Sequence, residues 1–127
     1  MSENSLSQDS VESYFEAWKT NNKELLLSVF SDDAVWEDPV GSPPHIGKDQ
    51  IGNFWDQAHS DPKGTLNPIT NRSVFLGNEA MVSFRMEVRG ESGGMDLEVT
   101  DFFKINSGGK IILARAFWDA TSITAIP

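Results

Sequence analysis

Hydrophobic residues in the first half of the chain recur with the spacing of a helix. Three segments each place four apolar residues on one face, at or close to the spacing i, i+3, i+4, i+7 that is typical of an amphipathic helix. These sets are Val11, Tyr14, Phe15 and Trp18; Leu25, Leu26, Val29 and Phe30; and Ile51, Phe54, Trp55 and Ala58. Asn22 precedes the second set and can cap that helix. Residues 1–6 are polar and are expected to form a frayed tail.

Between the second and third helices we expect less regular structure. Residues 31–33 read as a turn, and residues 34–38 as a short strand that Pro39 ends. Because the residue before a proline is held extended, Asp38 should lie at the very end of this strand. Residues 41–44 are rich in glycine and proline and predict a loop.

After residue 64 the hydrophobic period changes to two, which is typical of strands. Strands are expected over 69–76, 80–89, 95–105 and 110–118, with turns at 77–78, 90–94 and 107–109. One face of the second strand carries Ala80, Val82, Phe84, Met86 and Val88, and one face of the third carries Met95, Leu97, Val99, Asp101, Phe103 and Ile105. Helices followed by a meander predict a single α+β domain over residues 1–127, with three N-terminal helices against a curved antiparallel sheet.

Charge and composition narrow the function classes. The chain has 127 residues, a net charge of −9 and no cysteine. An acidic protein without clustered Lys and Arg is not expected to bind nucleic acid or an anionic membrane surface. The absence of cysteine excludes disulfides, thiolate metal sites and cysteine nucleophiles. The N-terminus lacks a secretory signal, so we expect a cytoplasmic location.

The sequence also argues against a metal or other cofactor. The acidic residues Asp32, Asp33, Glu37 and Asp38 lack the regular ligand spacing of a hard-cation loop. His45 and His59 are isolated and do not have the spacing of a metal pair. No glycine-rich phosphate loop or HExxH helix is present.

Three residues are candidates for chemistry. Asp101 lies among apolar residues on one strand face, so it must be a protonated acid or find a partner, unless a bulge turns it to solvent. Tyr14, the only tyrosine, lies on the buried stripe of the first helix, either as a packed side chain with a satisfied hydroxyl or as a donor at a site. Asp38 is either a turn-forming residue or a carboxylate at the edge of a pocket.

These residues fall within segments that resemble the bacterial ketosteroid isomerases. The stretch Val35-Trp36-Glu37-Asp38-Pro39-Val40-Gly41-Ser42 resembles the strand and loop that carry the general base of that family. Val99-Thr100-Asp101-Phe102-Phe103-Lys104 resembles the strand that holds its oxyanion-hole aspartic acid. The helix around Tyr14 and the ending Ala116-Phe117-Trp118 also fit, so the resemblance covers roughly residues 11–118.

The resemblance implies a fold, an activity and a set of site residues. The fold would be that of the nuclear transport factor two-like superfamily, usually dimeric, and no cofactor would be needed. The activity would be that of a steroid delta-isomerase, in which Asp38 shuttles a proton while Tyr14 and protonated Asp101 stabilise a dienolate oxygen. A pocket for a hydrophobic ketone would be lined by Val82, Phe84, Met86, Val99, Phe103, Trp118, Phe30 and Trp55. Phe30 and Trp55 stand where family members often carry further tyrosines.

Other functions stay open at this level. A polyketide-cyclase-like enzyme commonly uses a His–Asp pair, and an epoxide hydrolase would need an Asp–Arg–Asp set. A non-catalytic module that binds a hydrophobic ligand or dimerises would keep an apolar pocket without needing all three candidate residues. An apolar patch around Phe102, with Ile112 or Leu113 beside it, is expected on the opposite sheet face and would suit a homodimer.

Overall fold

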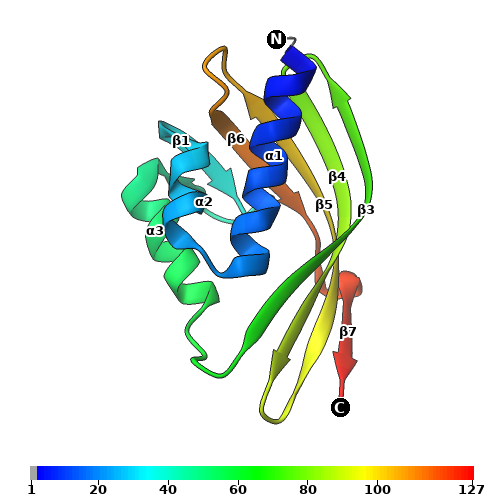
Figure 1. The fold of residues 1–127 in the computed structure, drawn as a ribbon. Coiled ribbons are helices and arrows are strands. Elements are labelled where there is room, and N and C mark those ends of the chain that lie inside the picture. The colour runs from blue at the N-terminus through cyan, green and yellow to red at the C-terminus, as the bar shows by residue number, and fades with distance from the viewer. Residues whose placement is uncertain (1–2) are drawn as a thin grey trace.

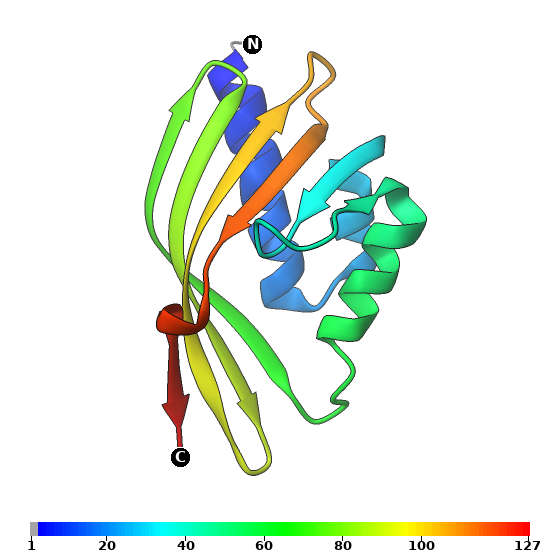
Figure 2. The same cartoon turned by 180° about the vertical axis from the view of Figure 1, so that it is seen from behind.

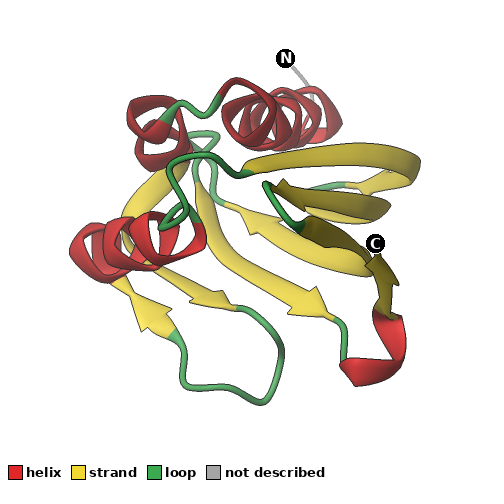
Figure 3. Ribbon diagram, turned by 90° about the horizontal axis from the view of Figure 1, so that it is seen from below, coloured by secondary structure: helices red, strands yellow, loops and turns green. Residues whose placement is uncertain are grey.

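The computed structural model describes residues 3–127, with side chains from residue 5 onward. Three helices lie on one side of a curved sheet (Figure 1). They are α1 (Glu3–Thr20), α2 (Lys23–Val29) and α3 (Gly47–Ala58). The view from below shows the sheet curving toward these helices (Figure 3). No helix within residues 3–127 is long and apolar enough to cross a membrane.

The sheet has seven strands. They are β1 (Phe30–Glu37), β2 (His45–Ile46), β3 (Thr65–Leu76), β4 (Glu79–Gly90), β5 (Gly93–Ile105), β6 (Ile111–Phe117) and β7 (Ile123–Ile126). Their order is β2-β1-β6-β5-β4-β3, and β7 pairs with the first part of β5, beyond the end of β6. A 3₁₀ turn, η1 (Ala120–Ser122), joins β6 to β7, as the view from behind shows (Figure 2).

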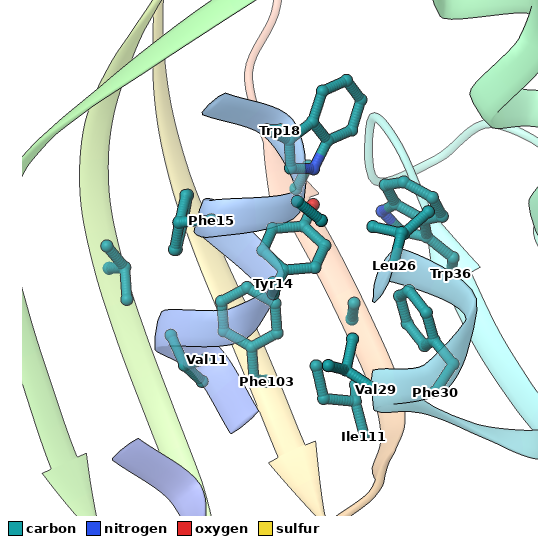
Figure 4. Packing of buried hydrophobic residues seen from close by; sticks show 14 of the residues in the cluster. Val11, Tyr14, Phe15, Trp18, Leu26, Val29, Phe30, Trp36, Phe103 and Ile111 are labelled. Carbon is teal, nitrogen blue, oxygen red and sulfur yellow. The ribbon is translucent and has the colours of Figure 1, made fainter. Parts of the chain in front are cut away.

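The predicted apolar stripes form the core between helices and sheet. The α1 stripe is buried throughout, from Val11 at 2% exposed to Trp18 at 6%. Tyr14 packs edge-on against Phe103 of β5 and Phe30 of β1, with ring centroids 4.9 and 6.2 Å apart (Figure 4). Asn22 caps α2 as predicted, and its side chain accepts a hydrogen bond from the backbone N–H of Leu25. Aromatic packing of this kind fixes where α1 lies on the sheet.

The expected frayed tail is wrong for residues 3–6, which already belong to α1. Two serines in the next turns explain why the helix starts so early. The hydroxyl of Ser7 donates to the backbone oxygen of Gly77 over 2.9 Å, and the hydroxyl of Ser10 bonds to the backbone oxygen of Gly109. These contacts tie the helix to two distant turns, which no local pattern reveals. Residues 1 and 2 lie outside the described part.

Three further expectations about the segment after α2 are corrected. Residues 31–33 form no turn, because β1 already begins at Phe30 and its register with β6 shifts between Phe30 and Val35. The strand is also parallel to β6, so the sheet is mixed rather than purely antiparallel. The short strand β2 pairs with β1 in the region expected to be loop or helix.

The outer sheet face carries several apolar side chains that no helix covers. Register brings Met81, Phe102 and Arg115 side by side across β4, β5 and β6. Leu113 pairs with Lys104 and is therefore the residue on this face next to Phe102. Met81 is 47% exposed. The homodimer that this face suggested stays a prediction.

Candidate active site

An apolar cavity of about 230 Å³ lies between α1, the end of α3 and the inner face of the sheet. All three candidate residues line it: Tyr14 from α1, Asp38 from the end of β1, and Asp101 from the middle of β5. The other lining residues are mainly aliphatic or aromatic: Phe15, Trp18, Phe54, Ala58, Leu66, Phe84, Met86, Val88, Met95, Leu97, Val99, Ala116 and Trp118. A few polar groups in an apolar hollow are typical of a small-molecule site.

Ala116 of β6 explains how two distant aspartates reach one cavity. Asp101 of β5 pairs with Ala116 in the sheet register. The chain just after Asp38 is bound to the same residue, because the N–H of Val40 donates to the backbone oxygen of Ala116 over 2.8 Å. Parallel pairing of β1 with β6 thus delivers Asp38 to the side of Asp101.

Asp101 is a buried carboxyl group. The residue is 4% exposed, and its Oδ2 atom has no hydrogen-bond partner among the described residues. Burial raises its pKa well above the ordinary value, and the charge of nearby Asp38 raises it further. Because no cation lines the cavity within residues 3–127, the neutral acid is favoured, and its O–H can serve as a donor.

Tyr14 is a buried phenol close to Asp101. It is 3% exposed, and burial raises its pKa well above the ordinary value. Ionisation of Asp101 or Asp38 would act in the same direction, whereas the indole of Trp18 opposes it. The hydroxyl therefore stays protonated at neutral pH and can donate to an oxygen in the cavity.

Asp38 is less deeply buried and has a partner. The indole Nε1 of Trp118 donates to its Oδ1 over 2.7 Å. Burial raises the pKa of Asp38 to about 6, although the hydrogen bond from Trp118 lowers it in part. At neutral pH roughly nine-tenths of such a group is ionised. A partly desolvated carboxylate of this pKa is suited to take up and return a proton near pH 7.

Four of the eight predicted pocket residues line the cavity: Phe84, Met86, Val99 and Trp118. The other four, Val82, Phe103, Phe30 and Trp55, do not line this cavity and belong to the packed core. Alternation predicts which face of the sheet a residue lies on. It does not predict which positions on that face are covered by a helix and which are left open to the cavity. The rings of Tyr14 and Phe15 fill the space over Phe103.

Sequence reasoning did not assign two tryptophan contributions. Trp118 was expected only as an apolar wall, yet its N–H holds Asp38. Trp18 lies on the same helix stripe as Tyr14 and lines the cavity as well. The i, i+4 spacing of Tyr14 and Trp18 was the one available signal. Met95 and Leu97 also line the cavity and share the strand face of Asp101.

Arginines and histidines lie elsewhere. Arg115 pairs with Glu37 on the outer face over 2.9 Å, and Arg89 pairs with Asp96 over 2.8 Å. His45 stacks on Phe54 outside the cavity lining. The Nδ1–H group of His59 donates to the backbone oxygen of Trp55 over 2.7 Å. Within residues 3–127 no group of three or more His, Asp or Glu side chains is arranged to hold a metal ion.

Solved structures share this fold at low sequence identity. The Mycobacterium tuberculosis protein RV0760c superposes with a TM-score of 0.87 at 18% identity, covering 94% of this chain and 96% of that one. The epoxide hydrolase/cyclase-like enzyme SalBIII, described as acting in pyran ring formation in salinomycin, gives 0.81 at 21% identity over 94% and 95%. An LEH-like epoxide hydrolase of M. tuberculosis gives a TM-score of 0.80 at 16% identity, covering 93% of this chain and 86% of that one.

A family model decides the classification. The model of the SnoaL-like domain matches residues 11–114, a span that includes Tyr14, Asp38 and Asp101 and most of the cavity wall. The structural neighbours include enzymes of the same fold. The chain belongs to the SnoaL-like domain family.

Proposed function

We propose that the protein is a steroid delta-isomerase-like enzyme, which moves a double bond from β,γ to α,β conjugation in a ketosteroid or similar hydrophobic ketone. The observation that carries the proposal is the pairing of one carboxyl group of pKa about 6 with one buried, neutral carboxyl group in the same apolar cavity. Two such groups can divide the roles of base and hydrogen-bond donor.

The proposed reaction needs only these groups. The Asp38 carboxylate removes a proton from the carbon between the carbonyl and the double bond, leaving a dienolate. The O–H groups of Tyr14 and Asp101 donate hydrogen bonds to the dienolate oxygen. The Asp38 acid then returns its proton to the γ-carbon, which yields the conjugated ketone and regenerates the carboxylate. No atoms are gained or lost, so the step balances without a cofactor.

A structural relative gives independent support for a steroid-like ligand. RV0760c, whose structure matches at a TM-score of 0.85 and 19% identity over 98% of this chain and 99% of that one, was solved in complex with estradiol-17beta-hemisuccinate. A protein of this fold can thus bind a steroid derivative. The apolar lining here, with polar groups gathered at Tyr14, Asp38 and Asp101, suits a flat hydrophobic ketone.

The cavity gives less support to the competing functions. An epoxide hydrolase with an Asp–Arg–Asp set would need an arginine at the site, and none lines the cavity within residues 3–127. A cyclase with a His–Asp pair would need a histidine there, and none of the described lining residues is one. A simple ligand-binding module would need no carboxyl group with a pKa close to neutral.

The test is turnover of a β,γ-unsaturated 3-ketosteroid, followed by the absorbance of the conjugated product. We expect isomerisation in the parent protein and its loss in Asp38→Asn. A matched control is Asp56→Asn, which removes an exposed carboxylate of α3 that pairs with Lys23 of α2. Steroid binding without any isomerisation would favour the binding-module reading and overturn the proposal.

A further inference from the structure

The indole N–H of Trp18 is a buried donor that the described part of the structure leaves without a well-directed partner. Trp18 is 6% exposed, and its Nε1 atom is buried with no hydrogen-bond partner of good geometry among the described residues. An indole N–H can only donate. A buried donor without an acceptor carries the full cost of desolvation, so its retention calls for an explanation.

The direction of this N–H is fixed by ring packing. The indole of Trp18 lies against Trp55 with ring centroids 4.5 Å apart, and stacks on His59 at 5.4 Å. Trp36 contacts it edge-on at 6.1 Å. In Figure 4 the indole nitrogen points toward the hydroxyl end of Tyr14, one helical turn earlier on α1. The two rings are 6.4 Å apart at an interplanar angle of 66°.

Tyr14 is the acceptor that the surroundings offer. A phenol hydroxyl has one proton to donate and lone pairs with which to accept. Asp38 already accepts from Trp118 at Oδ1. The indole also lowers the pKa of Tyr14, against the larger effect of burial, as a donor beside the phenol oxygen should.

We propose that Trp18 is a positioning residue whose indole N–H donates to the Tyr14 hydroxyl oxygen and turns the phenol proton toward a ligand oxygen in the cavity. A donor to the phenol oxygen makes the phenol a stronger acid and hence a stronger donor to the ligand. The catalytic consequence rests on the proposed function, whereas the Trp18–Tyr14 hydrogen bond does not. The contact tightens when a ligand oxygen engages the proton of Tyr14.

The test uses Tyr14 as the only tyrosine in the chain. Growth on fluorotyrosine places a single ¹⁹F probe at position 14 and lowers the phenol pKa, which brings its ionisation nearer to the working range. We expect Trp18→Phe, which keeps the ring but removes the N–H, to make this phenol a roughly three- to tenfold weaker acid. Trp55→Phe is the matched control, because it removes an indole from the same stack and should leave the Tyr14 titration unchanged.

A titration of Tyr14 that is unchanged, or shifted to lower pH, in Trp18→Phe would overturn the proposal. If that variant does not fold, the fluorotyrosine-labelled parent protein provides the test. The indole ¹⁵N–¹H signal of Trp18 should move as the phenol at position 14 ionises. A signal that does not respond overturns the proposal. Neither readout needs turnover, so each can fail or succeed independently of the isomerase activity. If the protein does isomerise a ketosteroid, Trp18→Phe should lower kcat with little change in KM.

Discussion

The two carboxyl groups of the cavity are the same side chain in two different surroundings. Asp101 lies in the middle of β5, enclosed by apolar neighbours, with Oδ2 unpaired within the described residues. Asp38 lies where β1 ends and accepts a 2.7 Å hydrogen bond from Trp118. Burial raises both pKa values, but only Asp38 has a donor that favours its charged form.

This difference in surroundings explains how one apolar cavity can hold both an acid and a base. Desolvation alone would push both groups toward the neutral form. The charge on Asp38 then raises the pKa of Asp101 further, so that ionisation of one group opposes ionisation of the other. The deeper burial of Asp101 and the indole N–H that donates to Asp38 together favour the charge on Asp38.

Removing the charged member should have the largest effect. Asp38→Asn keeps the shape of the side chain but cannot take up a proton. We expect turnover of a β,γ-unsaturated ketosteroid to fall by about 10²–10⁴-fold, the usual contribution of a positioned base. Steady-state kinetics measure it, with binding of a phenolic steroid as the check on folding. Full activity in this variant would move the role of base away from Asp38, with Glu37 as the next residue to test.

Tyr14→Phe should follow in size. Loss of one donor to a developing oxyanion typically lowers the rate by about 10²–10³-fold. We expect kcat to fall more than substrate affinity, since the hydrogen bond strengthens as charge develops on the oxygen. Weaker binding with unchanged kcat would instead reduce Tyr14 to a packing residue.

The neutral member of the pair can be tested by two substitutions at Asp101. Asp101→Asn keeps an N–H donor and should stay within about tenfold of the parent, whereas Asp101→Ala should lose about 10²-fold. Infrared difference spectroscopy of the labelled carboxyl group gives its protonation state directly. A carboxylate band without an acid carbonyl band at neutral pH would remove the distinction between the two aspartates.

Trp118→Phe should reduce the difference in pKa between the two aspartates without removing it. Without the indole N–H, the charged form of Asp38 is less favoured, so its pKa should rise above about 6. The rate should rise with pH through the pKa of Asp38 in the parent, and this rise should move to higher pH in the variant, by no more than about one pH unit. An unshifted profile would mean that Trp118 serves only as an apolar wall.

The smallest expected effect is on the pH dependence of the free energy of unfolding. Because the folded pKa of Asp38 lies above its unfolded value, its contribution is full below about pH 4 and is lost as pH rises through about 6. The parent should therefore lose more free energy of unfolding between pH 4 and 7 than Asp38→Asn does, by at most about 3 kcal/mol. Urea unfolding at the two pH values measures the difference, and equal losses would contradict the raised pKa.

Local sequence patterns were sufficient to predict most of the helices and strands. Period-3.6 stripes located three helices, and the change to period two after residue 64 located the meander, because side-chain spacing follows directly from backbone geometry. Alternation also placed Asp101 on the same face as Val99 and Phe103, which are both buried. The resemblance then singled out Tyr14, Asp38 and Asp101, and the fold brings all three to one cavity.

Strand pairing, the lining of the cavity and the hydrogen-bond partners of buried groups depend on the tertiary structure. The parallel pairing of β1 with β6 and the contact of Ser7 with Gly77 join segments far apart in the chain, and no local spacing encodes them. Register along the strands set which residues of the inner face line the cavity and which pack behind it, so that Met86 lines it and Val82 does not. The partner of the Trp118 N–H likewise depends on ring orientation, because a donor acts only on the acceptor that packing places before it.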